Sequence, residues 1–527
     1  MSNNRNRFIY MLKKRNQKNK NQNIDRHIKS FRSKDFVKFV KFFLVIILFI
    51  CLCSSDSIYT RFLKEGSELN WVNIYSMTNL KQITWQNKVA YKIKENEKNI
   101  DDFTDLIIHF NEVKKTGFSI IGNYKVIESS YLPNIENKVY GEASANFSLS
   151  HHRIKLLPDD NSIFTPGKSI KSFTISCWLY PQSSYEGNEI FSYYGPSYNK
   201  VTDQIEFTGF KVFLLANKIV LKFDNLFYLQ DSPISFEINT GIELDIARWQ
   251  HIAITYNHNN GELICYKNNR KTSITWLTDS SKENGTLLNA KIPYELRTYL
   301  IVGANYIGNI DEFVIEKKVE DEFDLSLYSK YGGEMVSKLI DLEYYSSDII
   351  NIELSSILEK QTILSVYYRI SEDFFNISDM VIPWKKYSRD SIIQGRYIQW
   401  KIKFFPSYDG SFSPQLNDII ITYIPNLPPA PPKELKYELM ENSQVKISWR
   451  KNLETDLYGY YVYYGYKSGF YINNDALEGK SPVFTTENYI ILTLKPETEY
   501  FVAIKAADKA AYHQKSQFSE EIVFRTF

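Results

Sequence analysis

The chain has 527 residues, too many for one ordinary domain, and its 43% hydrophobic and 24% charged residues are typical of a protein that buries cores. Its 21 Gly and 17 Pro exclude a collagen-like or low-complexity architecture, and its four Cys exclude a disulfide-stapled scaffold or a multi-cysteine zinc array. Charge is uneven: residues 1–41 carry 13 Lys or Arg against Asp25 and Asp35, a balance of +11, and the remainder carries −9.

The basic leader ends at an apolar segment, residues 42–53, which is 12 residues long. A basic block before an apolar run is the positive-inside signature of a membrane-inserted N-terminus, and the length suits a signal peptide better than a full membrane span. Cys51 or Cys53, followed by two serines, resembles a bacterial lipoprotein junction, although Ile50 or Leu52 stands where that junction has a small residue. An uncleaved signal anchor, acylation at either cysteine, and a cleaved secreted form all remain open.

The leader also raises the question of nucleic acid. It lacks interleaved aromatic residues and adjoins the membrane segment, so contact with anionic lipid headgroups explains its charge more simply. We therefore expect no nucleic-acid partner. We expect a membrane-anchored protein whose C-terminal region lies outside the cytoplasm, in the periplasm or on the cell surface.

Beyond residue 54 the chain consists of short runs rich in Ile, Val, Tyr, Phe and Thr, separated by Asn, Asp, Gly and Ser. This pattern predicts an all-β chain of tandem β-sandwiches. Residues 54–102 are polar with two Trp, and we expect them to form an extension or stalk.

Residues 103–330 contain an ordered series of strand-like segments: 105–110, 139–147, 172–181, 248–256, 261–269 and 308–315. In this order they resemble a concanavalin A-like or laminin G-like jelly roll, a fold of two curved antiparallel sheets. The resemblance implies that Trp178, Trp249 and Phe313 pack in the core rather than forming a sugar platform. Asp311 and Glu312 match the Asp-Glu pair that closes laminin G-like domains, where the resemblance implies either a structural role or a calcium contact; no other cofactor is expected.

Two further modules follow. In residues 334–424, apolar and polar residues alternate, which predicts a second β-sandwich. The segment loosely resembles galactose-binding-like domains. Residues 425–432 hold five prolines and predict a stiff linker. Residues 433–527 resemble a fibronectin type III domain of the immunoglobulin-like class, in which Trp449 fills the space between two sheets and the Tyr500 hydroxyl reaches a backbone group at the corner.

Catalytic patterns are incomplete in this sequence. In the glucanase branch of the jelly-roll class, paired carboxylates lie on one strand, but Asn309 stands where the nucleophilic Glu belongs and Phe313 and Ile315 share the face with Asp311. The seven His show no metal-binding spacing. Cys177 and Cys265 form either a disulfide or two separate buried thiols.

The sequence thus predicts a non-enzymatic, membrane-anchored envelope or surface protein whose modules bind carbohydrate or protein for adhesion or scaffolding. The alternatives are a diverged glycoside hydrolase or lyase of the concanavalin A-like class and an envelope assembly factor. Its ligand and its oligomeric state stay open.

Overall fold

The computed structural model describes residues 59–66, 70–114, 118–183, 187–199, 203–378 and 381–527. Within these ranges every regular element is a β-strand, as the sequence predicts. The described part of the chain offers no helix of the length and hydrophobicity that a bilayer crossing requires. The basic leader, the apolar segment 42–53, and Cys51 and Cys53 lie outside the described residues.

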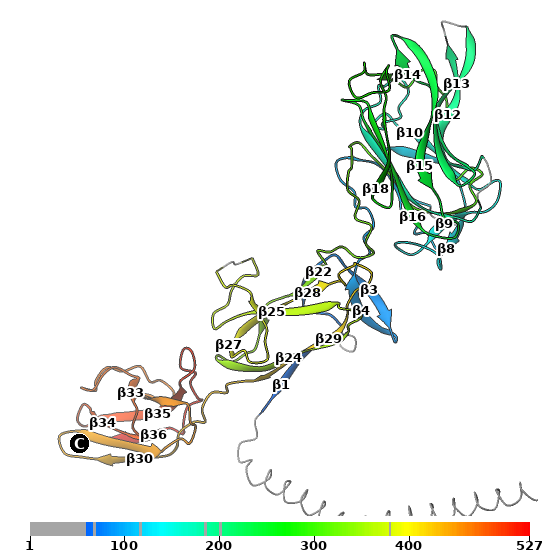
Figure 1. Ribbon diagram of the computed structural model, residues 1–527. Helices are drawn as coiled ribbons and strands as arrows, with labels where there is room; N and C mark the ends of the chain where they lie inside the picture. The colour runs from blue at the N-terminus through cyan, green and yellow to red at the C-terminus, as the bar shows by residue number, and fades with distance from the viewer. Residues whose placement is uncertain (1–58, 67–69, 115–117, 184–186, 200–202, 379–380) are drawn as a thin grey trace, which may run out of the picture. The chain divides into compact units, whose positions relative to one another are not determined.

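The first sandwich is a jelly roll of two antiparallel sheets, seen as the cyan and green part of Figure 1. The eight-stranded sheet has β14 (Lys218–Leu229), β13 (Gln204–Leu215) and β12 (Glu189–Asn199) at its centre, and its other strands are β15 (Ser232–Glu243), β20 (Leu300–Val302), β10 (Arg153–Pro158), β7 (Tyr124–Ser130) and β19 (Asn289–Ala290).

The nine-stranded sheet lies across the core from the eight-stranded one. Its central strands are β16 (Gln250–Asn257), β11 (Phe173–Pro181) and β21 (Gly308–Glu316), and its other strands are β18 (Arg270–Trp276), β17 (Glu262–Lys267), β5 (Thr104–Ile108), β6 (Ile121–Gly122), β9 (Ser144–Phe147) and β8 (Leu132–Asn134). Most of these strands fall within the segments predicted from the sequence.

Strand β11 shows how the sequence fixes the two faces of this sheet. Phe173, Ile175, Cys177 and Leu179 join one large apolar core. Because side chains alternate along a strand, the residues between them, including Trp178, face outward. The outer face of the nine-stranded sheet therefore carries polar and aromatic groups, and the candidate pocket described below lies there.

A second sandwich contains strands from two distant parts of the sequence. One of its sheets has the order β27 (Ile393–Gly395), β24 (Ser347–Ile357), β29 (Gln415–Ile424), β4 (Lys88–Ile93) and β3 (Leu80–Trp85), with β1 (Arg61–Gly66) also on β29. The other has the order β2 (Ile74–Thr78), β22 (Gly333–Ser337), β28 (Tyr397–Phe405), β25 (Ile363–Ser371) and β26 (Lys385–Lys386), with β23 (Ile340–Asp341) on β28.

This pairing corrects the expectation of a stalk over residues 54–102. Strand β4 hydrogen-bonds to β29 through the pairs Lys92–Gln415 and Tyr91–Leu416, and β2 pairs with β22. Figure 1 shows β3 and β4, in blue, beside β29. Ala90, Tyr91 and Ile93 are buried, because these strands cover the core of the second sandwich. The jelly roll is thus an insertion, in chain order, between β4 and β22.

The C-terminal residues fall in a separate compact unit. They form a three-stranded sheet of β30 (Lys433–Leu439), β31 (Gln444–Arg450) and β34 (Tyr489–Thr493) and a four-stranded sheet of β33 (Val483–Thr485), β32 (Leu457–Gly465), β35 (Glu499–Asp508) and β36 (Ile522–Arg525). Trp449 and Tyr500 are both buried in the core between these sheets. The Tyr500 hydroxyl accepts a hydrogen bond from the Lys495 backbone N–H at 3.3 Å and donates one to Asp475 at 2.9 Å.

Candidate functional site

One hollow of the jelly roll is a cleft of about 920 Å³, here called the tyrosine cleft. Its wall carries Tyr198 and Tyr294, which are 45% and 68% exposed, and the half-buried Tyr228. Amide, hydroxyl and charged side chains complete the lining: Asn199, Asn225, Asn289, Ser197, Thr208, Ser232, Glu206, Asp231, Glu295 and Lys291.

The cleft arises because the inward face of β12 and β13 changes character along the strands. Tyr193 and Phe210 fill the core, but farther along the same face the residues are Ser197 and Asn199 on β12, opposite the β13 segment that carries Glu206. The Asn199 amide donates to the Glu206 carboxylate at 3.0 Å, which orients both groups. The apolar core therefore ends beyond Tyr193 and Phe210, and polar side chains form the floor of the cleft.

The chemistry of this cleft suits a polyhydroxylated ligand. A tyrosine ring offers an apolar face and a polar tip, and amides and carboxylates can donate to or accept from hydroxyl groups. Burial, together with the charges of Glu206 and Glu295, raises the pKa of Tyr228, so its phenol stays protonated at neutral pH. A concave surface with a few placed polar groups is the usual form of a small-molecule site.

A second hollow, here called the acidic pocket, has a volume of about 370 Å³ and lies against the outer face of the nine-stranded sheet. Four aromatic rings line it, those of Tyr140, Trp178, His251 and Phe323. Its charged lining consists of one lysine, Lys98, and seven carboxylates: Glu97, Asp101, Glu312, Glu316, Glu320, Glu322 and Asp324. The lining is therefore strongly acidic.

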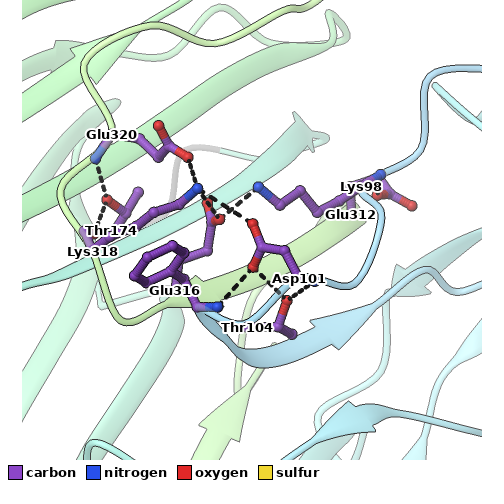
Figure 2. Close-up of polar contacts among 9 residues, drawn as sticks. Lys98, Asp101, Thr104, Thr174, Glu312, Glu316, Lys318 and Glu320 are labelled. Atoms are coloured by element: carbon purple, nitrogen blue, oxygen red, sulfur yellow. Dashed lines mark hydrogen bonds and ion pairs between the residues drawn. The ribbon is translucent and has the colours of Figure 1, made fainter.

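Lysines neutralise part of this acidity at one end of the pocket (Figure 2). The buried Glu316 carboxylate pairs with the Lys98 ammonium at 2.5 Å and with the Lys318 ammonium at 3.4 Å. Lys318 also pairs with Glu320 at 2.6 Å and with Asp101 at 3.3 Å. These contacts tie the segments before β5 and after β21 to the sheet, so this end of the pocket is held by a network rather than by one pair.

Asp311 and Glu312, the predicted calcium candidates, are both buried and have different partners. The Asp311 carboxylate accepts hydrogen bonds from the backbone N–H groups of Val139 and Tyr140, at 2.8 and 3.3 Å, and so holds the loop before β9. Burial raises its pKa well above the usual range. Asp311 therefore has a clear structural use, and calcium binding at this pair stays a prediction.

Glu312 belongs to a cluster that the sequence analysis did not find. Its carboxylate lies 2.6 Å from His109 Nδ1, and one ligand atom from each of Glu97, His109 and Glu312 lies within 4.8 Å of the others. Burial lowers the pKa of His109, but the hydrogen bond and charge of Glu312 outweigh that effect and raise it overall. A nitrogen ligand with two carboxylates suits zinc or manganese better than calcium, which prefers oxygen alone. Glu97 was missed because it lies in the segment expected to be a stalk.

The predicted core tryptophans of the jelly roll need correction, whereas Phe313 is fully buried in the core. Trp178 is half-buried and lines the acidic pocket, because its neighbours Cys177 and Leu179 point inward. Trp249 is also half-buried, packs against Tyr180, and donates its indole N–H to the Asn137 side chain at 2.8 Å. For Trp178, the alternation of inward and outward residues along β11 would have indicated from the sequence that the ring faces outward.

Asn309, which stands where a nucleophilic Glu was sought, is fully buried. Its amide nitrogen donates to the Ser144 hydroxyl at 2.9 Å and the Asn137 carbonyl at 3.1 Å, and its oxygen accepts from Asn146 at 2.7 Å. All of its polar atoms thus join β21 to the segment around β9. Asn309 is a structural residue in this fold.

Comparison with known proteins supports the fold of the first sandwich. Residues 157–319 match the model of the concanavalin A-like lectin/glucanases superfamily. No curated protein matches the chain. Among solved structures, the chain is similar to domain 4 of AbnA, a GH43 extracellular arabinanase from Geobacillus stearothermophilus in complex with arabinotriose, at 15% identity over 41% of this chain and 94% of that chain, with a TM-score of 0.26.

Two other solved structures share this level of similarity. The botulinum neurotoxin serotype D binding domain is 13% identical over 77% of this chain and 85% of its own, with a TM-score of 0.29. The CBM40 of the Ruminococcus gnavus IT-sialidase is 10% identical over 30% of this chain and 89% of its own, with a TM-score of 0.20. These scores are low, and the fold assignment rests on the family match and the strand order.

Proposed function

We propose that this chain is a non-enzymatic binding protein whose jelly roll holds a glycan in the tyrosine cleft. The observation that carries this proposal is the lining of the cleft, in which three tyrosines stand among amide and carboxylate side chains. The match of residues 157–319 to a superfamily described as lectins and glucanases is consistent with it.

The physical basis is the two-sided character of a sugar ring. Its C–H face is apolar and can lie on a tyrosine ring, while its hydroxyl groups need hydrogen-bond partners that water would otherwise supply. Tyr294 offers an exposed ring, and Asn289 and Lys291 also line the cleft. A loop end of a rigid sandwich is also where binding residues are commonly placed.

The non-enzymatic part of the proposal rests on the β21 strand. Asp311 is buried and holds a loop, and Asn309 is committed to structural hydrogen bonds, so neither is placed to act on a bound sugar. Turnover of any polysaccharide by the purified chain would instead favour the diverged hydrolase or lyase.

The remaining parts of the proposal come from the sequence. We infer that the basic leader and residues 42–53 anchor the chain in a membrane, with or without acylation at Cys51 or Cys53, and that the sandwiches work outside the cytoplasm as an envelope or surface protein. The C-terminal sandwich serves in this scheme as a fibronectin type III spacer, and the second sandwich as a galactose-binding-like module. The mass of the mature N-terminal peptide distinguishes the three fates of the leader.

The experiment that tests glycan binding compares the wild-type chain with Tyr294→Ala. Binding is screened on a glycan array and the strongest glycan is then titrated by calorimetry. Because Tyr294 is mostly exposed, its removal should leave the fold intact and weaken binding by about tenfold, or about 1.4 kcal/mol. Tyr408→Ala, at a fully exposed tyrosine outside the jelly roll, is the matched control and should bind like the wild type. A glycan bound equally by both variants would contradict the placement of the site.

A further inference from the structure

Three side chains of the kinds that bind metal ions come together beside the acidic pocket. Glu97 lies in the segment that enters the jelly roll, His109 directly follows β5, and Glu312 lies on β21. The Glu312 Oε1 atom is 2.6 Å from His109 Nδ1, and one ligand atom from each of the three lies within 4.8 Å of the other two. Because the three residues are far apart in the sequence, only the fold brings them together.

This cluster is shielded from water and has an excess of negative charge. The side chains of Glu312 and Glu97 are 6% and 12% exposed. The Lys94 ammonium lies 3.7 Å from the Glu97 carboxylate, but this lysine is 48% exposed, and an ion pair with an exposed partner contributes little. Two shielded carboxylates this close to each other repel, and a divalent cation between them would remove the repulsion.

Neighbouring groups hold both carboxylates in place. The Glu312 Oε2 atom accepts a hydrogen bond from the Lys98 backbone N–H at 3.0 Å, which leaves Oε1 for the cluster. The Asn111 side-chain amide donates to Glu97, and the Asn111 oxygen accepts in turn from the Glu142 backbone N–H at 2.7 Å. Outer hydrogen bonds of this kind orient the ligands of metal sites.

Two backbone features accompany these contacts. Glu312 has a φ of 47°, in the left-handed region, at the register shift where β21 pairs with the β11 step from Ser176 to Trp178. A strand residue other than glycine rarely adopts this conformation, and such bulges re-aim side chains, often at functional sites. Gly141 has a φ of 62°, and its loop lies so close that a methyl group there would collide with the Glu97 carboxylate. The backbone thus departs from regular geometry at both carboxylates.

The geometry points to a zinc site formed by His109, Glu97 and Glu312. An imidazole nitrogen with carboxylate oxygens is a typical donor set for zinc, whereas calcium prefers oxygen alone and manganese binds such ligands more weakly. Zinc bonds to these atoms at about 2.0 to 2.2 Å, which places its ligand atoms roughly 3 to 3.5 Å apart, so small side-chain rotations open the His109–Glu312 contact far enough. The site shares Glu312 with the predicted calcium pair but does not use Asp311, and it does not depend on the proposed glycan function.

An ion can reach this site from solvent. Glu97 and Glu312 both line the acidic pocket of about 370 Å³, and the His109 side chain is 24% exposed. Water from the pocket can complete the coordination, as it does in zinc sites with three protein ligands. Because the ligands come from three segments, the ion ties the segment before β5 to both β5 and β21. Its role is that of a clamp at the start of the jelly roll.

The test titrates the full-length chain, stripped with a chelator, by calorimetry with zinc chloride and with calcium chloride. We expect one tightly bound zinc ion per chain and binding of calcium that is weaker by about tenfold or more. His109→Gln keeps a hydrogen-bond donor for Glu312 but lacks the imidazole, and it should weaken zinc binding by about tenfold or more. His151→Gln, at an exposed histidine of the same domain, is its control and should bind zinc like the wild type.

Glu97→Gln is a second variant, because its amide oxygen can still accept from Asn111 while the charged ligand is lost. It should also weaken zinc binding by about tenfold or more, and its control is Glu136→Gln, at an exposed glutamate. Hydrogen exchange at the Lys98 amide, which donates to Glu312, reports the clamp. Saturating zinc should slow this exchange by about tenfold or more in the wild type and in both controls, and should leave it unchanged in the two variants.

Three outcomes would overturn the site: the chain binds no stoichiometric zinc, calcium binds as tightly as zinc, or both variants bind zinc like their controls. Tight zinc binding that leaves the Lys98 exchange unchanged would overturn the clamp. Circular dichroism checks that each variant is folded, and either variant alone decides the outcome, since each removes one ligand and keeps a side chain that can form hydrogen bonds.

Discussion

At the scale of single residues, the outer face of the nine-stranded sheet is unusual for its aromatic and ionisable side chains. His251 lies between Trp178 and Phe323 and is almost fully buried. A neutral imidazole costs less free energy in this position than a charged one, which would have to give up its hydration. This burial lowers the pKa of His251 to about 3, compared with the ordinary value of 6.5.

The low pKa of His251 predicts a pH dependence of stability. Below about pH 6.5 the unfolded chain takes up a proton at this residue while the native chain does not, so the jelly roll loses stability as the pH falls toward 3. Between about pH 7.5 and pH 4.5 the loss should be between about 2 and 3 kcal/mol. The variant His251→Phe keeps an aromatic ring between Trp178 and Phe323. In this variant the loss of stability between about pH 7.5 and pH 4.5 that is due to His251 should disappear.

The measurement is hydrogen exchange of the β11 and β16 amides in denaturant, which reports unfolding of the jelly roll alone. His109, whose raised pKa acts in the opposite sense, is present in both proteins and cancels in the comparison. His151→Phe, at an exposed histidine, is the control and should keep the wild-type slope. Equal pH dependence of His251→Phe and the wild type would contradict the prediction.

At the scale of elements, strand order decides questions that the sequence leaves open. Cys177 lies on β11 and Cys265 on β17, and β16 runs between these strands with both as neighbours. Neighbouring strands are about 4.8 Å apart, so two strands separated by a third are roughly 9.5 Å apart, beyond the 7 Å or so that a disulfide can bridge. Both residues are accordingly free, buried thiols in the structure.

This arrangement predicts how the two thiols react. Burial raises the pKa of Cys265 to about 11 and that of Cys177 still further, so neither carries the thiolate that alkylating reagents attack. Iodoacetamide should leave both unmodified in the native chain and modify both after unfolding, as measured by peptide mass spectrometry. The same result is expected with and without prior reduction. A peptide pair linked through Cys177 and Cys265 in the unreduced protein would show that the strand order is wrong.

The strand order also shows which features of the fold could be predicted from the sequence. The alternation of β11, β16 and β21 predicted a jelly roll because each strand carries its own pattern of buried residues, and residues 157–319 match that superfamily. The same alternation, read residue by residue, would have placed Trp178 outside. The two hollows could not be predicted, because each collects side chains from several strands and loops, and Glu97 with His109 and Glu312 is such a set.

At the scale of the whole molecule, the main feature hidden from the sequence is the split of the second sandwich. Strands β2–β4 are only five or six residues long, too short to be recognised from the sequence alone as part of a sandwich. They become strands because β22 and β29, far along the chain, offer open edges and an apolar face. The segments that enter and leave the jelly roll lie together: Glu95 pairs with Tyr328, and the Asn96 N–H donates to the Leu327 carbonyl at 2.9 Å. Adjacent ends are what an inserted domain requires.

This topology predicts where the chain can be cut. A fragment of residues 94–330 keeps both sheets of the jelly roll and the paired segments at its ends, so it should fold alone. A fragment of residues 333–527 lacks β1, β2, β3 and β4 and leaves Leu416 and its buried neighbours without cover. Losing the buried side chains of Ala90, Tyr91 and Ile93 should cost the second sandwich several kcal/mol, at about 25 cal/mol per Å² of apolar surface.

The two fragments are compared by calorimetry and by binding of a hydrophobic dye. Residues 94–330 should show one cooperative unfolding transition and little dye binding, whereas residues 333–527 should bind dye and retain a cooperative transition only for the C-terminal sandwich. Adding residues 59–93 as a separate peptide supplies the control, because strands that complete a sheet should suppress dye binding by the second sandwich of the 333–527 fragment. If residues 333–527 instead unfolded in two cooperative transitions without the peptide, the second sandwich would be stable without β2–β4. The prediction that these strands are an essential part of it would then be wrong.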